Sequence, residues 1–289
     1  MPVAVGRVGT WSSSRIWPAD PGAVADAASE LEKLGYGALW LGGTPAGTLE
    51  MPEALLNATA TMTVATGIVS VWLSPAAEVA AAYQRVAGAH PGRFLLGLGA
   101  SHAPPVEAAG QRYHRPYQKL AGFLDGLDRA SPPVPREGRV LAALGPRVLA
   151  LARDRTAGAH PYLVTPEHSR RAREILGPGP LLAPEQKVIL ETDAGRARRI
   201  ARACLHTYLQ LPNYTASLLR LGFTEEDISR SSDRLVDGLV AWGDEEAVAR
   251  RVAEHHQAGA DHVCIHALTS ERALPIAQWR ALAPVLTSL

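Results

Sequence analysis

The feature that most constrains this chain is a regular alternation of short apolar segments with amphipathic helical ones. A strand pattern at residues 3–9 precedes a helical pattern at 21–34, and Gly35 follows at the position expected for a helix C-cap. The apolar segments are hydrophobic throughout rather than at every second residue, which indicates burial on both faces. Such strands alternating with helices predict parallel βαβ units.

Over the whole chain, the pattern gives eight strands with helices between them. The predicted strands span 3–9, 38–41, 64–72, 94–98, 140–144, 159–163, 187–191 and 262–267. The predicted helices span 21–34, 52–62, 75–88, 118–127, 146–153, 166–176, 195–209, 244–256 and 271–286. Eight such units favour an α/β fold of the (β/α)8 TIM-barrel type, with an open doubly wound sheet as the alternative.

Loop insertions are expected at the C-terminal face of the strands, in a long loop at 103–116 and an excursion at 212–240. The length of 289 residues suits a single domain spanning 1–289, because barrels of this type commonly run to about 250 residues. The proline-rich segment 131–138 is expected to be a stiff connector, since the strand–helix rhythm continues across it.

Composition narrows the classes of partner. The formal net charge is +1, so no nucleic-acid or membrane-surface patch is indicated. Cys204 and Cys264 lie far apart without metal spacing, and the neighbouring His255 and His256 do not share a helix face, so no metal site is expected. No apolar stretch approaches 18 residues, and no signal-peptide pattern is present. We therefore expect a cytoplasmic protein that acts on a small molecule.

A barrel places its active site at the carboxyl ends of the strands, which directs attention to the turn Gly145-Pro146-Arg147. A glycine between strand and helix lets backbone amides approach an anion, and the helix N-terminus and Arg147 add positive charge. The turn could bind a phosphate or be a plain strand-to-helix connection. The stretch 97–102 contains Gly97 and Gly99 but is an incomplete phosphate-loop pattern.

Three histidines follow predicted strands and could face the same mouth. They are His102, His160 and His266, and histidine suits proton transfer near neutral pH, although each could be structural. Trp11 also lies at a strand end, where it could pack against a flat ring or belong to the core. Gly67 stands inside a predicted strand, which indicates a bulge, a close ligand approach or a crowded helix contact.

With these residues laid out, the chain resembles the bacterial luciferase-like monooxygenase superfamily, and more narrowly its deazaflavin-dependent oxidoreductases, which use coenzyme F420. The resemblance covers nearly the whole chain, and the order and spacing of its stretches are more specific than any one of them. The matching stretches are 8–11, 30–40, 65–68, 91–99, 142–147 and 157–162.

The resemblance implies a site. It places a non-prolyl cis peptide at Gly67–Ile68, in a bulge behind the deazaflavin ring, and a phosphate turn at 145–147 with a second turn at Ala157-Gly158. The cofactor-binding residues expected are Thr66, Gly67, Ile68, Gly99, Ser101, Gly145, Pro146, Arg147, Ala157 and Gly158. The substrate-binding residues expected are Trp11, Tyr113 and His266, and the expected proton donors are His102 first and His160 second. The resemblance also leads us to expect a homodimer.

Two departures from the family pattern stand out. The second phosphate turn usually reads Asp-Gly, but here Ala157 precedes Gly158. Several relatives place an acidic residue, often followed by histidine, after the second strand, whereas this chain reads Leu41-Gly42-Gly43-Thr44. A mechanism that uses that acidic pair therefore does not transfer to this chain.

The leading interpretation is an F420-dependent oxidoreductase that moves a hydride between the deazaflavin and a small organic substrate. One alternative is an FMN-dependent luciferase-like monooxygenase or reductase of the same fold. A second is a non-catalytic, coenzyme-binding barrel, suggested by the two departures. An aldolase-like barrel would need a Schiff-base lysine at a strand end, and none of Lys33, Lys119 and Lys187 is well placed for that role.

Overall fold

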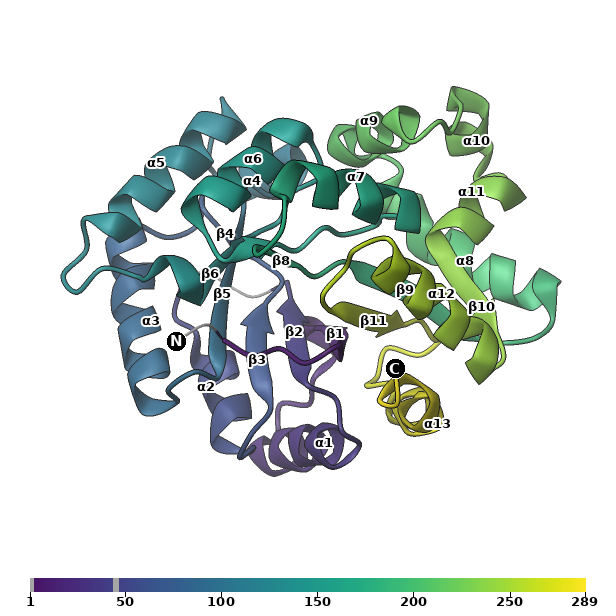
Figure 1. The fold of residues 1–289 in the computed structure, drawn as a ribbon, viewed down its shortest axis with the longest axis horizontal. Helices are drawn as coiled ribbons and strands as arrows, with labels where there is room; N and C mark the ends of the chain where they lie inside the picture. Colours follow the sequence, from purple (N-terminus) through teal and green to yellow (C-terminus); the bar gives the residue numbers. More distant parts are fainter. Residues whose placement is uncertain (1–2, 44–46) are drawn as a thin grey trace.

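The computed structural model describes residues 3–43 and 47–289, and its centre is one sheet of parallel strands connected through helices (Figure 1). The sheet order is β10-β9-β11-β1-β2-β3-β5-β6-β7-β8, with β4 paired to β5. The strands are β1 (Val8–Ser13), β2 (Ala38–Gly42), β3 (Thr63–Thr66), β4 (Val69–Ser70), β5 (Phe94–Gly99), β6 (Arg139–Leu141), β7 (Gly158–Ala159), β8 (Leu181–Leu182), β9 (Glu185–Leu190), β10 (Val240–Gly243) and β11 (Val263–Ala267).

Helices occupy most of the connections, and α9, α10 and α11 gather at one end of the molecule (green in Figure 1). The α-helices are α1 (Pro21–Lys33), α2 (Glu50–Asn57), α3 (Ala76–Ala89), α4 (Ala103–Ala108), α5 (Pro116–Asp128), α6 (Pro146–Arg155), α7 (Pro166–Leu176), α8 (Ala194–Tyr208), α9 (Pro212–Arg220), α10 (Glu225–Arg230), α11 (Asp233–Leu239), α12 (Glu245–Gln257) and α13 (Ile276–Leu286). Short 3-10 helices are η1 (Ser14–Ile16) and η2 (Arg136–Gly138). In the described part of the chain, no helix is long and apolar enough to cross a membrane.

The helices begin where the sequence provides a cap. The side chains of Asp20, Thr165, Asp193 and Asp244 each accept a hydrogen bond from the backbone N–H three residues later, at the starts of α1, α7, α8 and α12. These bonds satisfy N–H groups that have no partner inside the helix. The caps therefore fix where the chain turns from a strand end into a helix.

The sheet curves so that its path nearly returns to its start. Only Ala183 and Pro184 separate β8 from β9, so the segment 181–190 contacts β7 on one side and β11 on the other. The Ala183 N–H donates to the Ala159 carbonyl at 2.9 Å, and the Cys264 N–H donates to the Pro184 carbonyl at 3.0 Å. The architecture is thus an α/β, TIM-barrel-like parallel sheet, while β10 pairs with β9 outside the run of eight strands that was predicted.

Both faces of the sheet are buried, which confirms the interpretation of the uniformly apolar strands. In β2, Leu39 and Leu41 pack into the large core beneath the helices, whereas Ala38 and Trp40 belong to an inner cluster. That inner cluster also contains Trp11 and Cys264. Successive side chains of a strand point to opposite faces, so one strand supplies both layers.

The predicted strand at 64–72 is divided in two. β3 ends at Thr66, the Gly67–Ile68 peptide is cis, and β4 begins at Val69. The bulge and the non-prolyl cis bond expected at this position are therefore confirmed. Before the break, the Thr66 hydroxyl donates to the Gly97 carbonyl at 2.9 Å and accepts from the Gly97 N–H at 2.8 Å, which joins β3 to β5.

Several predicted boundaries are wrong for local reasons. The first strand begins at Val8 rather than at residue 3 because Gly6 has a φ of +68°, and it continues to Ser13, which pairs with Gly42. The strand predicted at 159–163 stops after Ala159, since Pro161 has no N–H to donate and Leu163 is left-handed with a φ of +58°. The loop predicted at 103–116 contains α4, and β8 and β10 were not predicted.

The Thr66–Gly97 contact generates a stability prediction. A Cβ added at Gly97 would come within 1.8 Å of the Thr66 carbonyl oxygen, so Gly97→Ala forces two strands apart. We expect the free energy of unfolding, measured by urea denaturation, to fall by about 1–3 kcal/mol or more. Gly122→Ala is the matched control, because Gly122 is exposed within α5, has nothing within 4 Å, and gains helix propensity on substitution. Equal stability of the two variants would contradict the close approach of β3 and β5.

Candidate active site

A cavity of about 1030 Å³ lies at the carboxyl ends of the strands. Its lining comes from β1, the Gly67–Ile68 peptide, the segments after β5, β6 and β7, and helices α8 and α9. Side chains separated by more than two hundred positions in the sequence thus meet at one mouth. The position agrees with the rule that such folds bind ligands at the carboxyl ends of their strands.

The floor of the cavity carries two buried polar atoms without partners. Trp11 Nε1 and His160 Nε2 make no hydrogen bond within the described residues, although Trp11 is 7% and His160 1% exposed. A Cβ added at Gly67 would lie 2.9 Å from Trp11 Nε1 and 3.1 Å from His160 Nε2. Glycine at position 67 therefore leaves open the space toward which an indole donor and an imidazole nitrogen converge. Buried polar atoms of this kind require an explanation, and a bound ligand provides one.

The His160 ring is fixed from two sides. Its Nδ1 lies 2.7 Å from the Ala183 carbonyl, which can only accept, so Nδ1 carries the proton and Nε2 is an acceptor. Its face stacks on Trp40 at a centroid distance of 4.1 Å. Burial lowers the pKa of His160 to about 4, so the ring is neutral at pH 7. Toward the cavity, His160 thus accepts a hydrogen bond and does not donate the proton expected of it.

The turn at the start of α6 carries positive charge into the cavity. Gly145 is the N-cap residue and offers no side-chain cap, which leaves the first N–H groups of α6 available. One guanidinium nitrogen of Arg220, from α9, lies 3.8 Å from where a Cβ on Gly145 would stand. Arg220 lines the cavity, and its side chain pairs with no carboxylate of the described residues. Arg147 is exposed beside the turn, with its guanidinium 4.4 Å above the Tyr117 ring.

A second wall is formed by the segment after β5. Ser101, His102 and Tyr113 all line the cavity. The sequence analysis expected Ser101 to bind the coenzyme, His102 to donate a proton and Tyr113 to bind the substrate. The Asn213 amide of α9 lies 3.4 Å from His102 Nδ1 and 3.4 Å from the Ser101 carbonyl. An amide that donates to Nδ1 leaves the proton of the neutral imidazole on Nε2. Burial lowers the pKa of His102, which keeps this ring neutral and able to donate one N–H.

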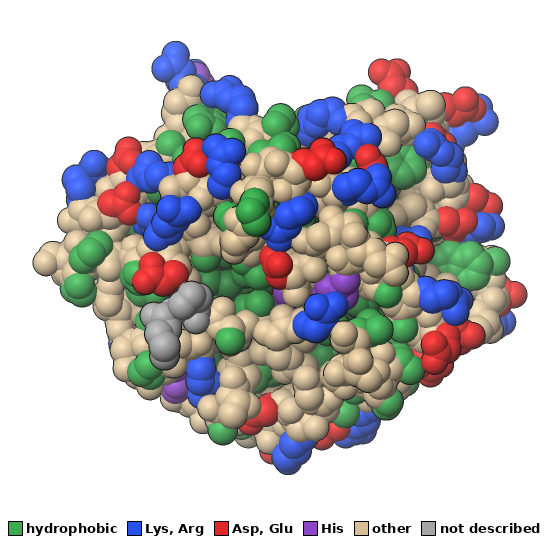
Figure 2. Space-filling view, in the orientation of Figure 1, with side chains coloured by type: hydrophobic (Ala, Val, Ile, Leu, Met, Phe, Trp, Pro, Cys, Tyr) green, Lys and Arg blue, Asp and Glu red, His purple; other side chains and the backbone are tan. Residues whose placement is uncertain are grey.

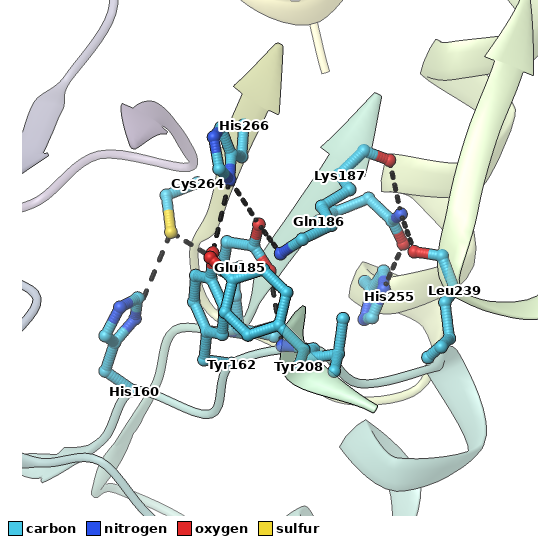
Figure 3. A network of polar contacts seen from close by, with 12 residues as sticks. His160, Tyr162, Glu185, Gln186, Lys187, Tyr208, Leu239, His255, Cys264 and His266 are labelled. Carbon is cyan, nitrogen blue, oxygen red and sulfur yellow. Dashed lines mark hydrogen bonds and ion pairs between the residues drawn. The ribbon is translucent and has the colours of Figure 1, made fainter. Parts of the chain in front are cut away.

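Tyr162 and Tyr208 form a further wall of the cavity. Behind them lies a buried network of charged side chains (Figure 3). Lys187 Nζ donates to Glu185 Oε1 at 2.7 Å, and both side chains are completely buried. His266 Nδ1 lies 3.0 Å from the same carboxylate oxygen, and the Leu163 N–H donates to the other oxygen at 3.2 Å. Tyr162 stands between this network and the cavity, with Lys187 Nζ 3.8 Å from its ring centre.

The pair of charges is held ionised by its own geometry. Burial by itself would raise the pKa of Glu185, but Lys187 and His266 lower it below its ordinary value. Burial would likewise lower the pKa of Lys187, and the adjacent carboxylate raises it instead. Lys187 is therefore a cation at neutral pH rather than the free amine that Schiff-base chemistry requires.

The charges facing the cavity have one sign. Arg15 and Arg220 line it, and no aspartate or glutamate of the described residues does. Figure 2 shows a hollow with hydrophobic side chains, and above it lysine and arginine side chains interspersed with aspartate and glutamate. The site therefore favours a ligand with an apolar body and an anionic end.

Other predicted residues lie outside the cavity lining. The hydroxyl of Thr66 bonds to Gly97, and Gly99 faces Ile68 and Ala142, so both shape the floor from behind. Pro146 is exposed in the first turn of α6. His266 packs behind Trp11 at 4.3 Å and bonds to Glu185.

Ala157 and Gly158 lie at the opposite end of the sheet from the mouth, because they precede and begin β7. The Ala157 N–H donates to the Arg139 carbonyl at 2.8 Å, and its own carbonyl accepts from Leu181 N–H at 2.7 Å. A Cβ on Gly158 would meet the Leu181 carbonyl at 1.9 Å. Glycine is needed there for strand packing, and the backbone is occupied by the sheet, so this turn lies outside the cavity lining.

The end of β2, where this chain has glycines instead of an acidic residue, is explained by steric contact with Trp11. A Cβ on Gly42 would lie 1.9 Å from the Trp11 indole, so that indole fills the space beside the strand end. Gly42 and Gly43 provide no acid or base, and Thr44 lies outside the described residues. Trp11 thus lies beside the strand end after which relatives carry an acidic residue.

The sequence analysis missed two tyrosines of the cavity lining, Tyr208 and Tyr214. It also missed Arg220 and the buried ion pair of Glu185 and Lys187. Tyr208 is the last residue of α8, and Tyr214 lies in the first turn of α9. Neither residue follows a strand, so the sequence pattern did not place them at the cavity. Glu185 and Lys187 did leave a signal. Two residues of opposite charge two positions apart in a strand share one face, which indicates an ion pair.

Comparison with known proteins identifies the family. The family described as luciferase-like monooxygenase matches residues 3–262, and the chain belongs to it. No curated protein matches the sequence.

Solved structures show the same fold at low identity. An F420-dependent secondary alcohol dehydrogenase, solved with an F420-acetone adduct, has a TM-score of 0.73 at 15% identity, covering 97% of this chain and 99% of that one. The oxygenating constituent of 3,6-diketocamphane monooxygenase from Pseudomonas putida, solved with FMN, has a TM-score of 0.69 at 13% identity, covering 98% and 96%. The F420-dependent tetrahydromethanopterin reductase from Methanopyrus kandleri has a TM-score of 0.66 at 12% identity, covering 98% and 97%.

The family match supports an enzyme of the oxidoreductase or monooxygenase class. The family named in the sequence-based interpretation is thereby confirmed.

The buried histidines generate a prediction for pH dependence. Burial lowers the pKa of His160 and His168 to about 4 and of His255 and His262 to about 3. Below about pH 6.5 the unfolded chain binds protons that the folded chain cannot, so stability falls as pH decreases. Each histidine contributes up to about 1.4 kcal/mol per pH unit. We expect the free energy of unfolding in urea to drop by several kcal/mol between pH 7.5 and 5.5.

Two variants control this experiment. His255→Gln removes one titrating group while keeping side-chain hydrogen bonding to Ser169 and Gln186 possible, so the slope against pH should decrease by about one proton. The exposed His114 can be changed to Gln as the matched control, and the slope should not change. A constant free energy of unfolding from pH 7.5 to 5.5 would show that these rings are not held neutral.

Proposed function

We propose that this protein is an oxidoreductase that binds coenzyme F420 and transfers a hydride between it and a small organic substrate. The observation that carries the proposal is the combination, in one cavity, of an open glycine floor and an unpaired arginine at a helix N-terminus. The floor at Gly67–Ile68 suits a flat ring, and Arg220 with the start of α6 suits a phosphate.

The residues present fit such a coenzyme. Trp11 Nε1 and His160 Nε2 offer a donor and an acceptor to a ring placed at Gly67, and neither atom has a hydrogen-bond partner among the described residues. When bound, the deazaflavin supplies the hydride chemistry, and the protein supplies position and electrostatics. Arg15 and Arg147 offer further positive charge for an acidic tail.

The remaining space of the cavity would hold the substrate. Trp11 and Tyr113 bound it, and His102 is the proposed group for proton transfer to or from the substrate, because its ring lines the cavity. His266 supports this wall indirectly through Trp11 and Tyr162. No carboxylate of the described residues lines the cavity, so proton transfer is assigned to imidazole or phenol groups.

FMN is the second candidate coenzyme. Its ring and single phosphate would use the same floor and the same α6 turn, and one of the similar structures holds FMN. Three arginines around the mouth exceed what one phosphate needs, which is why F420 with its acidic tail is preferred.

Equilibrium binding tests the proposal. Purified protein is titrated with F420 and separately with FMN, and fluorescence quenching gives the dissociation constants. F420 should bind more tightly. Arg220→Ala should weaken binding about 10- to 100-fold, because a hydrogen bond to a charged group contributes about 1.5–3 kcal/mol.

Arg250→Ala is the matched control. Arg250 is an exposed arginine on α12 outside the cavity lining, so its loss removes the same charge without touching the site. Preferential FMN binding would transfer the protein to the monooxygenase branch. Binding of neither coenzyme, or equal loss in both variants, would overturn the proposal.

A further inference from the structure

Two tyrosines in the wall of the cavity share one hydrogen bond between their hydroxyls. Tyr162, just after β7, and Tyr208, the last residue of α8, have their oxygens 2.8 Å apart. Both residues line the cavity. Figure 3 shows the two rings side by side, with His266 and Lys187 directed at Glu185 behind them.

One of the two hydroxyl protons of this pair is not used in the hydrogen bond between the tyrosines. Two hydroxyls carry two protons, and their mutual bond uses one of them. The other group near Tyr162 is His266 Nδ1 at 3.4 Å, but that nitrogen already donates to the Glu185 carboxylate. Lys187, beneath the rings, has only protons to give. One phenolic proton therefore has no acceptor among the described residues.

The surroundings keep the pair protonated and polarised. Burial raises the pKa of both tyrosines, so both are neutral phenols at pH 7. Lys187 Nζ lies 3.8 Å from the centre of the Tyr162 ring and 5.0 Å from that of Tyr208. The other charged or titratable groups nearby are Glu185, His266, Cys204 and Tyr214. A cation under a phenol strengthens that phenol as a hydrogen-bond donor.

We propose that Tyr162 and Tyr208 form a binding site for one carbonyl or phenolate oxygen, with Lys187 behind it favouring negative charge on that oxygen. The ligand group is an oxygen conjugated to a flat, otherwise apolar body, since the cavity around the pair is largely aromatic and aliphatic. The inference deepens the proposed oxidoreductase function by naming the chemistry of its ligand. The oxygen belongs either to the substrate or to a ring carbonyl of the coenzyme.

The test uses 4-nitrophenol as the probe, because its phenolate absorbs visible light and reports its own ionisation. Absorbance titrations at several pH values give its affinity and the pKa of the bound phenol. We expect the bound phenol to ionise at lower pH than the free one. Tyr162→Phe/Tyr208→Phe should weaken phenolate binding about 10- to 100-fold.

The single variants and a control complete the design. Removing one hydroxyl leaves the other proton free, so one single variant should retain most of the binding and thereby identify the donor. Tyr83→Phe is the matched control, because Tyr83 lies on α3 outside the cavity lining, and binding should not change. Circular dichroism confirms that each variant is folded.

The outcomes separate the possibilities. Unchanged affinity and probe pKa in the double variant, or equal loss in Tyr83→Phe, would overturn the inference. If saturating FMN or F420 displaces the probe, the oxygen is the coenzyme's, and if the loaded protein still binds it, the oxygen is the substrate's. The titration itself needs no coenzyme, so it can succeed where coenzyme binding fails and the two proposals fall separately.

Discussion

The break of the sheet at Gly67–Ile68 is the constraint on which the site depends. Thr66 joins β3 to β5 through two hydrogen bonds immediately before the break, and β4 pairs with β5 again immediately after it. The chain is therefore held on both sides while one peptide lies against the cavity without a side chain at position 67. Trp11 and His160 approach that position because glycine leaves the space between them open.

The polar groups around the cavity fall into two kinds. Behind the wall, Glu185, Lys187 and His266 satisfy one another, which is necessary for charges that are fully removed from water. Facing the cavity, Trp11 Nε1, His160 Nε2 and one phenolic proton of the tyrosine pair have no partner in the part of the chain that the structure describes. The buried groups behind the wall have their hydrogen bonds satisfied, whereas groups facing the cavity still have hydrogen bonds to offer. Such an arrangement suits a preorganised ligand site, because the protein does not have to rearrange to bind the ligand.

The residue pattern predicted the repeating strand–helix order and the turn at Gly145, because both depend on local patterning. At Gly67 the pattern left a bulge as one of three possibilities, and the family resemblance implied it. It did not predict β8, a two-residue strand, or β10, which follows three helices of an insertion. Tyr208, Tyr214 and Arg220 were missed because they reach the mouth from α8 and α9, through packing that no local pattern encodes.

The second phosphate turn at Ala157-Gly158 was expected from the family resemblance and not from the residues themselves. In the structure, sheet pairing begins at Gly158 and occupies the backbone of Ala157, so this segment belongs to the sheet. The strict eight-strand barrel was the simplest closure of the pattern, and the extra pairing of β10 with β9 could not be read from it. The single-domain organisation and the homodimer remain predictions.

The most direct measurement is a crystal structure of the protein with F420 bound, or with FMN if that coenzyme binds more tightly. The account predicts a ring lying against Gly67–Ile68, with Trp11 and His160 within hydrogen-bond distance of its polar edge. It also predicts a phosphate at the start of α6 in contact with Arg220. A ring bound elsewhere, or a phosphate remote from Arg220, would contradict the account.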